Sequence, residues 1–236
     1  MPWLDRLLRD DAPPARDFHA GAFEGLYGFV YDRAIQQDAL RRLAGVAYGD
    51  MGPVVDLDGF CRRVAAGTVA RNGGPPVLLD VPTGGGTLLP RLAKAGYGGR
   101  VIASDLGGAM LDRARRRSAG LDVAYLQADA QDLPLADASV DAAVSLNGMH
   151  CIPDPWRFVA ELGRVVRPGG RLFLITLVSR GDVRADVVIG VGRLAGIIPG
   201  PLPRYDQLVE DLGQAGFGDI RSLGGRGITG LAATRS

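Results

Sequence analysis

The chain has 236 residues, of which 47% are hydrophobic, 22% charged and 6% aromatic, enough to bury one α/β core. Its formal net charge of +1 at pH 7 excludes the basic stripe with which proteins hold nucleic-acid phosphates. No apolar run reaches the roughly 18 residues of a membrane span, and Cys61 and Cys151 lack a zinc-ligand spacing, so we expect a cytoplasmic protein without a membrane span, nucleic-acid partner or metal site.

The first 74 residues predict a helical cap in front of the core. The N-terminal 15 residues suit a short amphipathic helix, and within residues 17–48 the aromatic residues Phe23, Tyr27, Phe29 and Tyr31 stand ahead of a helical pattern. Residues 57–70 continue helically until a stretch with glycine and proline breaks the chain. We therefore expect the first strand of the core to begin after residue 75.

The segment Val77–Thr87 joins a short apolar strand to a glycine loop. Val77–Leu79 predict a buried parallel strand, Asp80 follows it, and a helical pattern resumes over residues 88–95. Between them, Gly84–Gly86 allow a ligand to approach the backbone near a helix N-terminus. The pattern is typical of a nucleotide-type pocket, although a tight turn without a ligand has the same glycines.

Two further predicted strands also end in acids. The apolar run Val101–Ser104 precedes Asp105, about 20 residues beyond the loop, which is the spacing of a ribose-binding carboxylate. The run Val123–Ala128 precedes Asp129. Acids at the ends of three successive strands favour a ligand pocket over a plain turn.

The remaining chain alternates elements that complete an α/β pattern. Arg115–Arg117 suit a solvated helix face, and the glycine- and proline-rich residues 181–203 predict either a packed connection or a lid over a pocket. The predicted helices span residues 110–117, residues 155 to the Pro168–Gly170 turn, and residues 208–215, and the predicted strands span 172–178, 220–223 and 228–233.

These ordered motifs resemble the class I S-adenosylmethionine (SAM) dependent methyltransferases, especially their small-molecule branch related to the ubiquinone and menaquinone enzymes. The resemblance covers about residues 75–178. The family's first motif, an acid followed by glycines at alternate positions, falls on Asp80–Gly86 with Pro82 as the one departure. Its fourth motif falls on VDAAVSLNGMHCIPDP, and its closing motif on residues 162–176.

The resemblance implies a Rossmann-like doubly wound α/β fold with a mostly parallel seven-stranded sheet. A C-terminal antiparallel hairpin would complete the sheet, and the helical N-terminal cap would occupy residues 1–74. Residues 75–236 would then form the SAM-binding core, with residues 181–203 as the candidate acceptor lid.

The resemblance also implies the residues around SAM. Asp105 falls on the family's ribose acid, Asp129 on its adenine-amino acid, and Asn147 on the segment that borders the methionine end. Asp80 and Thr83 either touch the ligand or stabilise the loop. The residues that we expect to contact the cofactor are Asp80, Pro82, Thr83, Gly84, Gly86, Asp105, Leu106, Met110, Asp129, Ala130 and Asn147.

Pro82 favours SAM over a nicotinamide dinucleotide. Proline has no backbone N–H, so a pyrophosphate cradle would lose a donor there, whereas SAM carries no phosphate. The chain also lacks a Tyr-x-x-x-Lys pair downstream, because its only lysine, Lys94, precedes the second strand. A nicotinamide oxidoreductase is therefore disfavoured.

The implied chemistry is an in-line displacement that moves the SAM methyl group to an oxygen, nitrogen or carbon of a small, largely apolar metabolite. Orientation supplies most of the rate, and a base is needed only if the acceptor must lose a proton. His150 is the candidate base and Tyr31 a second candidate catalytic residue, although each also suits a packing role. A SAM-binding protein that catalyses a cyclisation or decarboxylation, and a homodimer, are both compatible with the sequence.

Overall fold

The computed structural model describes most of the predicted core and little of the predicted cap. Tyr31 and residues 181–201 of the predicted lid lie outside the described residues. The described residues are 1–11, 56–71, 73–118, 120–179, 202–225 and 228–236.

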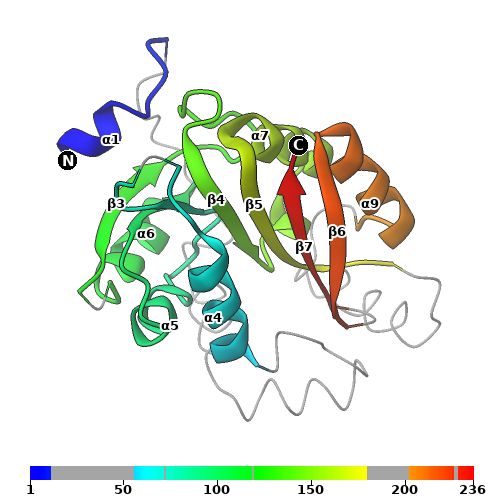
Figure 1. The fold of residues 1–236 in the computed structure, drawn as a ribbon, viewed down its shortest axis with the longest axis horizontal. Helices are drawn as coiled ribbons and strands as arrows, with labels where there is room; N and C mark the ends of the chain where they lie inside the picture. The colour runs from blue at the N-terminus through cyan, green and yellow to red at the C-terminus, as the bar shows by residue number, and fades with distance from the viewer. Residues whose placement is uncertain (12–55, 72, 119, 180–201, 226–227) are drawn as a thin grey trace.

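The core is a seven-stranded sheet in the order β3-β2-β1-β4-β5-β7-β6 (Figure 1). The first five strands pair in parallel, whereas β7 pairs antiparallel with both β5 and β6. The predicted mostly parallel sheet with its antiparallel C-terminal hairpin is confirmed. The strands are β1 (Val77–Asp80), β2 (Arg100–Asp105), β3 (Asp122–Gln127), β4 (Val140–Leu146), β5 (Val166–Leu177), β6 (Phe217–Gly224) and β7 (Ile228–Arg235).

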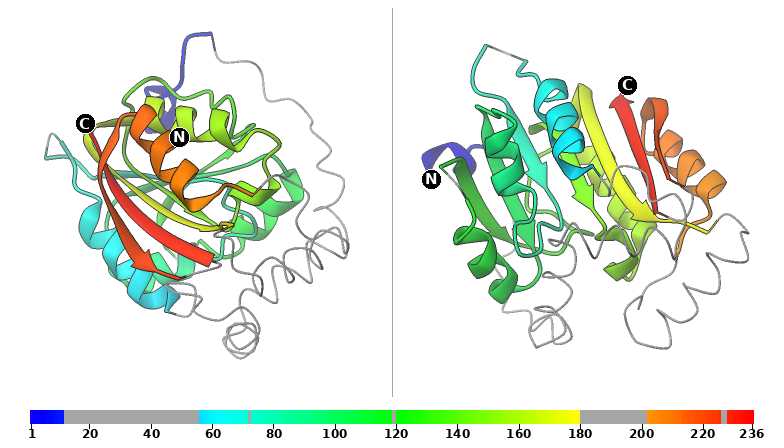
Figure 2. Two further views of the ribbon diagram at one scale, coloured as in Figure 1. Left: turned by 90° about the vertical axis from the view of Figure 1, so that its right-hand side faces the viewer. Right: turned by 90° about the horizontal axis from the view of Figure 1, so that it is seen from below.

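Helices cover both faces of the sheet (Figure 2). Leucine and phenylalanine side chains of α4 and α5 pack on one face, and those of α7 and α9 pack on the other. None of the helices that the structure describes is long and apolar enough to cross a membrane. These helices are α1 (Pro2–Asp5), α4 (Leu57–Gly67), α5 (Leu89–Lys94), α6 (Gly108–Arg115), the 3-10 helix η2 (Met149–Cys151), α7 (Pro155–Val165) and α9 (Tyr205–Gln214).

The central strands are buried on both sides, which leaves only their ends for a ligand. Leu78 and Leu79 are both 0% exposed, and they belong to the hydrophobic clusters on opposite faces of the sheet. The chain runs from β1 outward through β2 to β3 and then returns to place β4 on the other side of β1. In open α/β sheets, ligands bind beyond the carboxyl ends of the strands at such a reversal.

The boundary between α7 and β5 differs from the prediction. The helix ends at Val165 rather than at the Pro168–Gly170 turn, and β5 begins at Val166. The pairing of β4 with β5 is irregular between Val140 and Ala142, so the proline and two glycines occupy a bulge within a strand. A Cβ on Gly170 would lie 2.7 Å from the carbonyl oxygen of Asp141, which explains glycine there.

Candidate cofactor and active site

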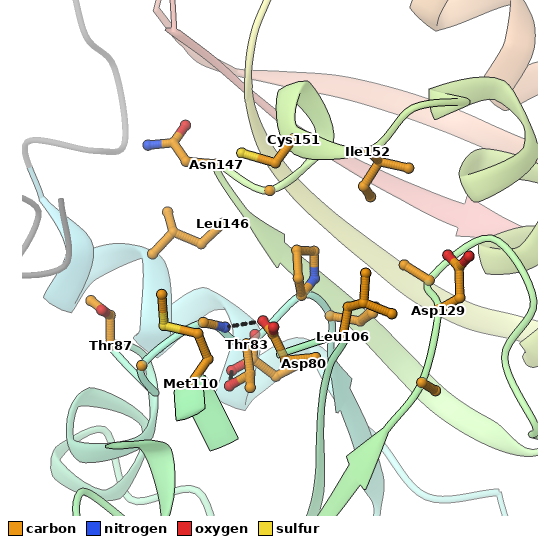
Figure 3. Close-up of a pocket in the computed structure, with 18 of the residues that line it drawn as sticks. Asp80, Thr83, Thr87, Leu106, Met110, Asp129, Leu146, Asn147, Cys151 and Ile152 are labelled. Carbon is orange, nitrogen blue, oxygen red and sulfur yellow. Dashed lines mark hydrogen bonds between the residues drawn. The ribbon is translucent and has the colours of Figure 1, made fainter. Parts of the chain in front are cut away.

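A cavity of about 250 Å³ opens at the carboxyl ends of the central strands (Figure 3). Four chain segments line it: the loop after β1 and the residues that follow β2, β3 and β4. The lining residues are Asp80–Gly85, Thr87, Leu88, Asp105, Leu106, Met110, Ala128–Gln131, Leu146–Gly148 and Cys151–Pro153.

The loop after β1 is held against its neighbours by hydrogen bonds. The N–H of Thr83 donates to the carbonyl oxygen of Ser104 at 2.8 Å, and the N–H of Gly86 donates to the carbonyl oxygen of Thr83 at 3.0 Å. The Thr83 hydroxyl donates to the Asp80 carboxylate at 2.7 Å. The loop therefore has a defined backbone, and its Val81–Pro82 bond is cis.

The two positive-φ glycines of this loop serve different purposes. At Gly84, with φ +54°, no atom of the described residues beyond its chain neighbours lies within 4 Å of the place where a Cβ would stand, and the residue lines the cavity. At Gly86, with φ +78°, a Cβ would lie 2.7 Å from the Cα of Ala114. Gly84 thus keeps space open for a ligand, whereas Gly86, predicted as a cofactor contact, packs against α6 and is not among the lining residues.

Asp105 sits where β2 ends and reaches back to the glycine loop. Its carboxylate accepts hydrogen bonds from the N–H groups of Gly84 at 2.8 Å and Gly107 at 2.9 Å. Burial raises the pKa of Asp105 above its usual value, and the backbone donors partly oppose this shift. Each oxygen keeps lone-pair capacity for a further donor.

Asp80 is the most deeply buried acid of the cavity, with 1% of its surface exposed. Burial raises the pKa of Asp80 to about 7; the negative charge of Asp105 adds to the increase, and the hydrogen bond from Thr83 opposes it. Near neutral pH the carboxyl group is therefore close to half-protonated.

Asp129 lies at the end of the cavity that Leu106 and Ile152 also reach, whereas Thr87 and Asn147 lie toward the other end (Figure 3). The Asp129 carboxylate accepts hydrogen bonds from the backbone N–H and the side-chain amide of Gln131, each at 2.9 Å. These bonds fix the direction of the acid.

Three carboxylates line the cavity, those of Asp80, Asp105 and Asp129. No lysine, arginine or histidine stands among its lining residues in the part of the chain that the structure describes. Opposite charge favours binding and like charge opposes it, so this cavity suits a cation and disfavours phosphates.

His150 is buried and does not line the cavity. It is 2% exposed, whereas the next residue, Cys151, belongs to the lining residues. Its Nδ1 atom has no hydrogen-bond partner among the described residues. Burial lowers the pKa of His150 to about 4, so the imidazole is neutral at pH 7.

Residues missed by the sequence interpretation include Arg117. Its guanidinium donates to the carbonyl oxygen of Gly85 at 2.6 Å, so this arginine supports the glycine loop rather than only a solvated face. Arg117 lies three residues after Ala114, the residue of α6 on which Gly86 packs, and this position near the glycine loop is the signal that could have identified it. Gln131, Cys151 and Ile152 also line the cavity unpredicted, although each closely follows a strand end.

Comparisons with known proteins agree with this geometry. Residues 79–174 match the family described as a methyltransferase domain. A demethylmenaquinone methyltransferase of Clavibacter sepedonicus is 39% identical over 112 residues, which are 44% of this chain and 45% of that protein. The structure of a SAM-dependent methyltransferase from Thermotoga maritima superposes with a TM-score of 0.61 at 17% identity, covering 91% of this chain and 98% of that one. The [4+2]-cyclase SpnF gives a TM-score of 0.56 at 26% identity, covering 72% and 62%.

Residues 79–174 of the chain therefore form a class I methyltransferase domain, and SAM is the cofactor that such a domain uses. Within this class its sequence relatives include demethylmenaquinone methyltransferases, which confirms the predicted resemblance. The chain spans about half the length of the curated relatives that it matches, or 45% for the Clavibacter enzyme.

The residues of the cavity fit SAM. SAM carries a sulfonium, an ammonium and one carboxylate group, so it has a net positive charge and no phosphate, which matches a cavity whose described lining has three acids and no base. Pro82, which lacks a backbone N–H, also lines this cavity. A phosphate would need an N–H donor at this position, whereas SAM has no phosphate and loses nothing. The open space at Gly84 gives the ligand room beside the loop.

Proposed function

We propose that the chain transfers the methyl group of SAM to an oxygen, nitrogen or carbon of a small, largely apolar metabolite. The observation that carries this proposal is the acidic cavity at the carboxyl ends of β1 and β4, within the methyltransferase domain. Its other walls are apolar, with Leu88, Met110, Leu146 and Ile152 among them. A buried apolar site with few placed polar groups is typical of small-molecule enzymes.

In this proposal the adenosine of SAM occupies the end of the cavity near Asp129. The ribose hydroxyls donate to Asp105, and the adenine amino group donates to Asp129 between the side chains of Leu106 and Ile152. Support comes from the position of Leu106, Asp129 and Ile152 at one end of the cavity and from the remaining acceptor capacity of Asp105.

The methionine part then extends toward Thr83, Thr87 and Asn147, with its ammonium group near Asp80. The buried Asp80 has no cationic partner among the lining residues, so an ammonium group would supply the missing charge. This placement directs the sulfonium methyl toward the end of the cavity away from Asp129.

SAM supplies the electrophilic methyl group, and the chain supplies binding and orientation. Holding the acceptor in line with the methyl group provides most of the acceleration. His150 and Tyr31 stay the candidate catalytic residues for an acceptor that must lose a proton. Because His150 does not line the cavity, we propose an acceptor that needs no strong base, such as an amine or an acidic hydroxyl.

We propose that the acceptor binds between the core and two other segments of the chain, residues 1–74 and residues 181–203. On this view residues 1–74 form the helical cap, residues 75–236 form the core, and residues 181–203 close over the acceptor. Support comes from the location of the cavity beyond the strand ends, where inserted segments of α/β enzymes select substrates.

Labelled SAM incubated with a panel of phenols, quinols and enolisable metabolites tests the proposal. Methylated product together with an equal amount of S-adenosylhomocysteine is the expected result. Asp105→Ala serves as the low-affinity control, and calorimetry with SAM and NAD checks the cofactor separately. Tight binding of NAD with none of SAM would contradict the proposal.

The similarity to the [4+2]-cyclase SpnF, at 26% identity, favours one second candidate. In it the chain binds SAM and uses the acceptor pocket for a cyclisation or a related non-methylating step. Conversion of a substrate without release of S-adenosylhomocysteine would support this second candidate. Equal amounts of methylated product and S-adenosylhomocysteine would exclude it.

We further propose a cytoplasmic homodimer. A small-molecule acceptor is the partner that the sequence relatives support, and the described helices include no membrane span. Light scattering on the purified chain, and fractionation of cells that express it, test the oligomeric state and the location.

A further inference from the structure

The first nine residues pair with a segment that lies more than 120 positions later in the chain. Leu8 forms an antiparallel bridge with Leu135. The N–H of Arg9 donates to the carbonyl oxygen of Pro134 at 3.0 Å, and the N–H of Ala136 donates to the carbonyl oxygen of Leu7 at 2.7 Å. These contacts make a short two-stranded pairing outside the main sheet.

An ion pair and apolar contacts extend this pairing. Arg9 Nη2 lies 3.0 Å from Asp132 Oδ1, with 25% and 45% of the two side chains exposed. Partly buried apolar side chains of the first nine residues pack against the same hydrophobic cluster as Leu133 and Leu135. These apolar residues are Trp3, Leu4, Leu7 and Leu8.

The partner segment also builds the cavity. Residues 128–139 connect β3 to β4 without a helix or a strand of the sheet, and their first residues, Ala128–Gln131, line the cavity. The N–H of Asp132 donates to the carbonyl oxygen of Asp129 at 3.0 Å. The residue that Arg9 holds is therefore one turn away from the proposed adenine acid.

A second clamp holds the same segment from α7. Glu161 accepts a hydrogen bond from the N–H of Leu133 at 2.9 Å, and Arg164 donates to the carbonyl oxygens of Leu133 at 3.0 Å and Leu135 at 2.7 Å. This clamp secures residues 133–135 to the core. Residues 129–132 are held by their own turn, by the N–H of Asp154, which donates to Gln131 Oε1 at 2.9 Å, and by the ion pair of Arg9 with Asp132.

We propose that Arg9 is a positioning residue for the cofactor site, which acts through Asp132 to hold the turn that presents Asp129 and Gln131 to the adenine. The inference rests on the proposed placement of SAM. It assigns to the extreme N-terminus a part in cofactor affinity, although none of its residues lines the cavity.

Two properties separate this role from a purely structural one. Because the α7 clamp and the apolar contacts remain, loss of the Arg9 side chain should leave the fold intact. The turn should then fluctuate more, and binding should weaken for any ligand that uses the adenine end. Adenosine and SAM should lose affinity by the same factor, since the methionine end lies away from this turn.

Calorimetric titration of Arg9→Ala and Asp132→Ala with SAM and with adenosine tests the proposal. We expect both Kd values to rise about two- to fivefold, in line with one partly exposed ion pair, and Arg9→Glu to weaken binding further through repulsion. The charge swap R9D/D132R should recover most of the loss. In turnover assays the KM for SAM should rise with kcat unchanged.

Arg221→Ala is the matched control, because Arg221 pairs with Asp219 at 3.0 Å on β6, at the opposite edge of the sheet from β3. It should leave both Kd values unchanged. Unchanged Kd values in Arg9→Ala, or a charge swap without recovery, would overturn the proposal.

Hydrogen exchange separates this outcome from failure of the proposed function. If the wild type bound neither SAM nor adenosine, the proposed function would fail on its own. Faster exchange at residues 129–132 in Arg9→Ala, with the glycine loop unchanged, is the result expected for the turn itself, and equal exchange in the two proteins would overturn the clamp independently of any ligand.

Discussion

The carboxylate of Asp105 accepts a hydrogen bond from the backbone N–H of Gly84 at 2.8 Å, which joins the end of β2 to the glycine loop after β1. Both residues line the cavity. One acid therefore fixes the loop and also lines the cavity. This double use explains why an acid at this spacing and a glycine loop occur together in the sequence.

Replacing Asp105 should weaken SAM binding. Asp105→Ala removes the proposed ribose acceptor and the anchor of Gly84, so we expect a loss of about 1 to 3 kcal/mol in binding free energy. Asp105→Asn keeps one acceptor oxygen and should lose less. Calorimetry measures both, with Asp112→Asn on the exposed side of α6 as the control. An unchanged SAM affinity in Asp105→Ala would remove this acid from the site.

The two loop glycines should respond differently to the same methyl group. Gly84→Ala places a Cβ in open space beside the cavity, so its main effect should be a loss of SAM affinity, with about 1 kcal/mol of strain from its positive φ. Gly86→Ala drives a Cβ into the backbone of Ala114, so its main effect should be a loss of about 2 to 3 kcal/mol in unfolding free energy.

Chemical denaturation and SAM titration of the two variants provide the comparison, with each variant serving as the control for the other. Equal losses of stability in the two variants, or a larger loss of affinity in a folded Gly86→Ala, would contradict these assignments.

The core could be predicted because its signals are local. Asp80, Asp105 and Asp129 follow short apolar runs, and buried parallel strands are such runs. Once three strand ends carry acids, the geometry of a parallel sheet brings them to one edge. The cavity lining contains all three.

The parts that could not be predicted depend on contacts between distant residues. The start of β5 at Val166 depends on a bulge against Val140 and Ala142 of another strand. The hydrogen bond of Arg117 to Gly85 depends on how α6 packs against the glycine loop. The pairing of Leu8 with Leu135 joins residues that are far apart in the sequence. Periodicity within one segment carries no information on such partners.

Asp80 should make SAM binding depend on pH. Its raised pKa of about 7 means that the free protein carries a protonated Asp80 below that pH. An ammonium group beside it favours the carboxylate, so affinity should rise as pH increases through about 7 and then level off. At pH 6 binding should be roughly tenfold weaker than on the plateau, since one pH unit below a pKa costs about tenfold.

Titrations between pH 6 and pH 8.5 measure this dependence, and Asp80→Asn, which cannot ionise, should show a pH-independent and weaker SAM affinity. A pH-independent SAM affinity in the wild type would contradict the proposed contact.

The raised pKa of Asp80 should also change the stability of the protein with pH. The favourable contribution of Asp80 is present below about pH 4 and is lost as pH rises through about 7, so Asp80→Asn should unfold at higher denaturant concentration than the wild type at pH 8.

His150 should reduce the stability of the protein in acid. Its folded-state pKa of about 4 lies below the value near 6.5 of an unfolded chain, so its contribution is present above about pH 6.5 and is lost as pH falls toward 4. At pH 5 the wild type should have lost about 2 kcal/mol through this group. Urea unfolding of the wild type and His150→Phe at pH 5 and pH 7.5 isolates that loss, because Asp80 titrates in both proteins. The same pH dependence in the two proteins would show that the buried imidazole takes up a proton freely, and a fall in kcat at unchanged SAM affinity in His150→Gln would assign it the role of base.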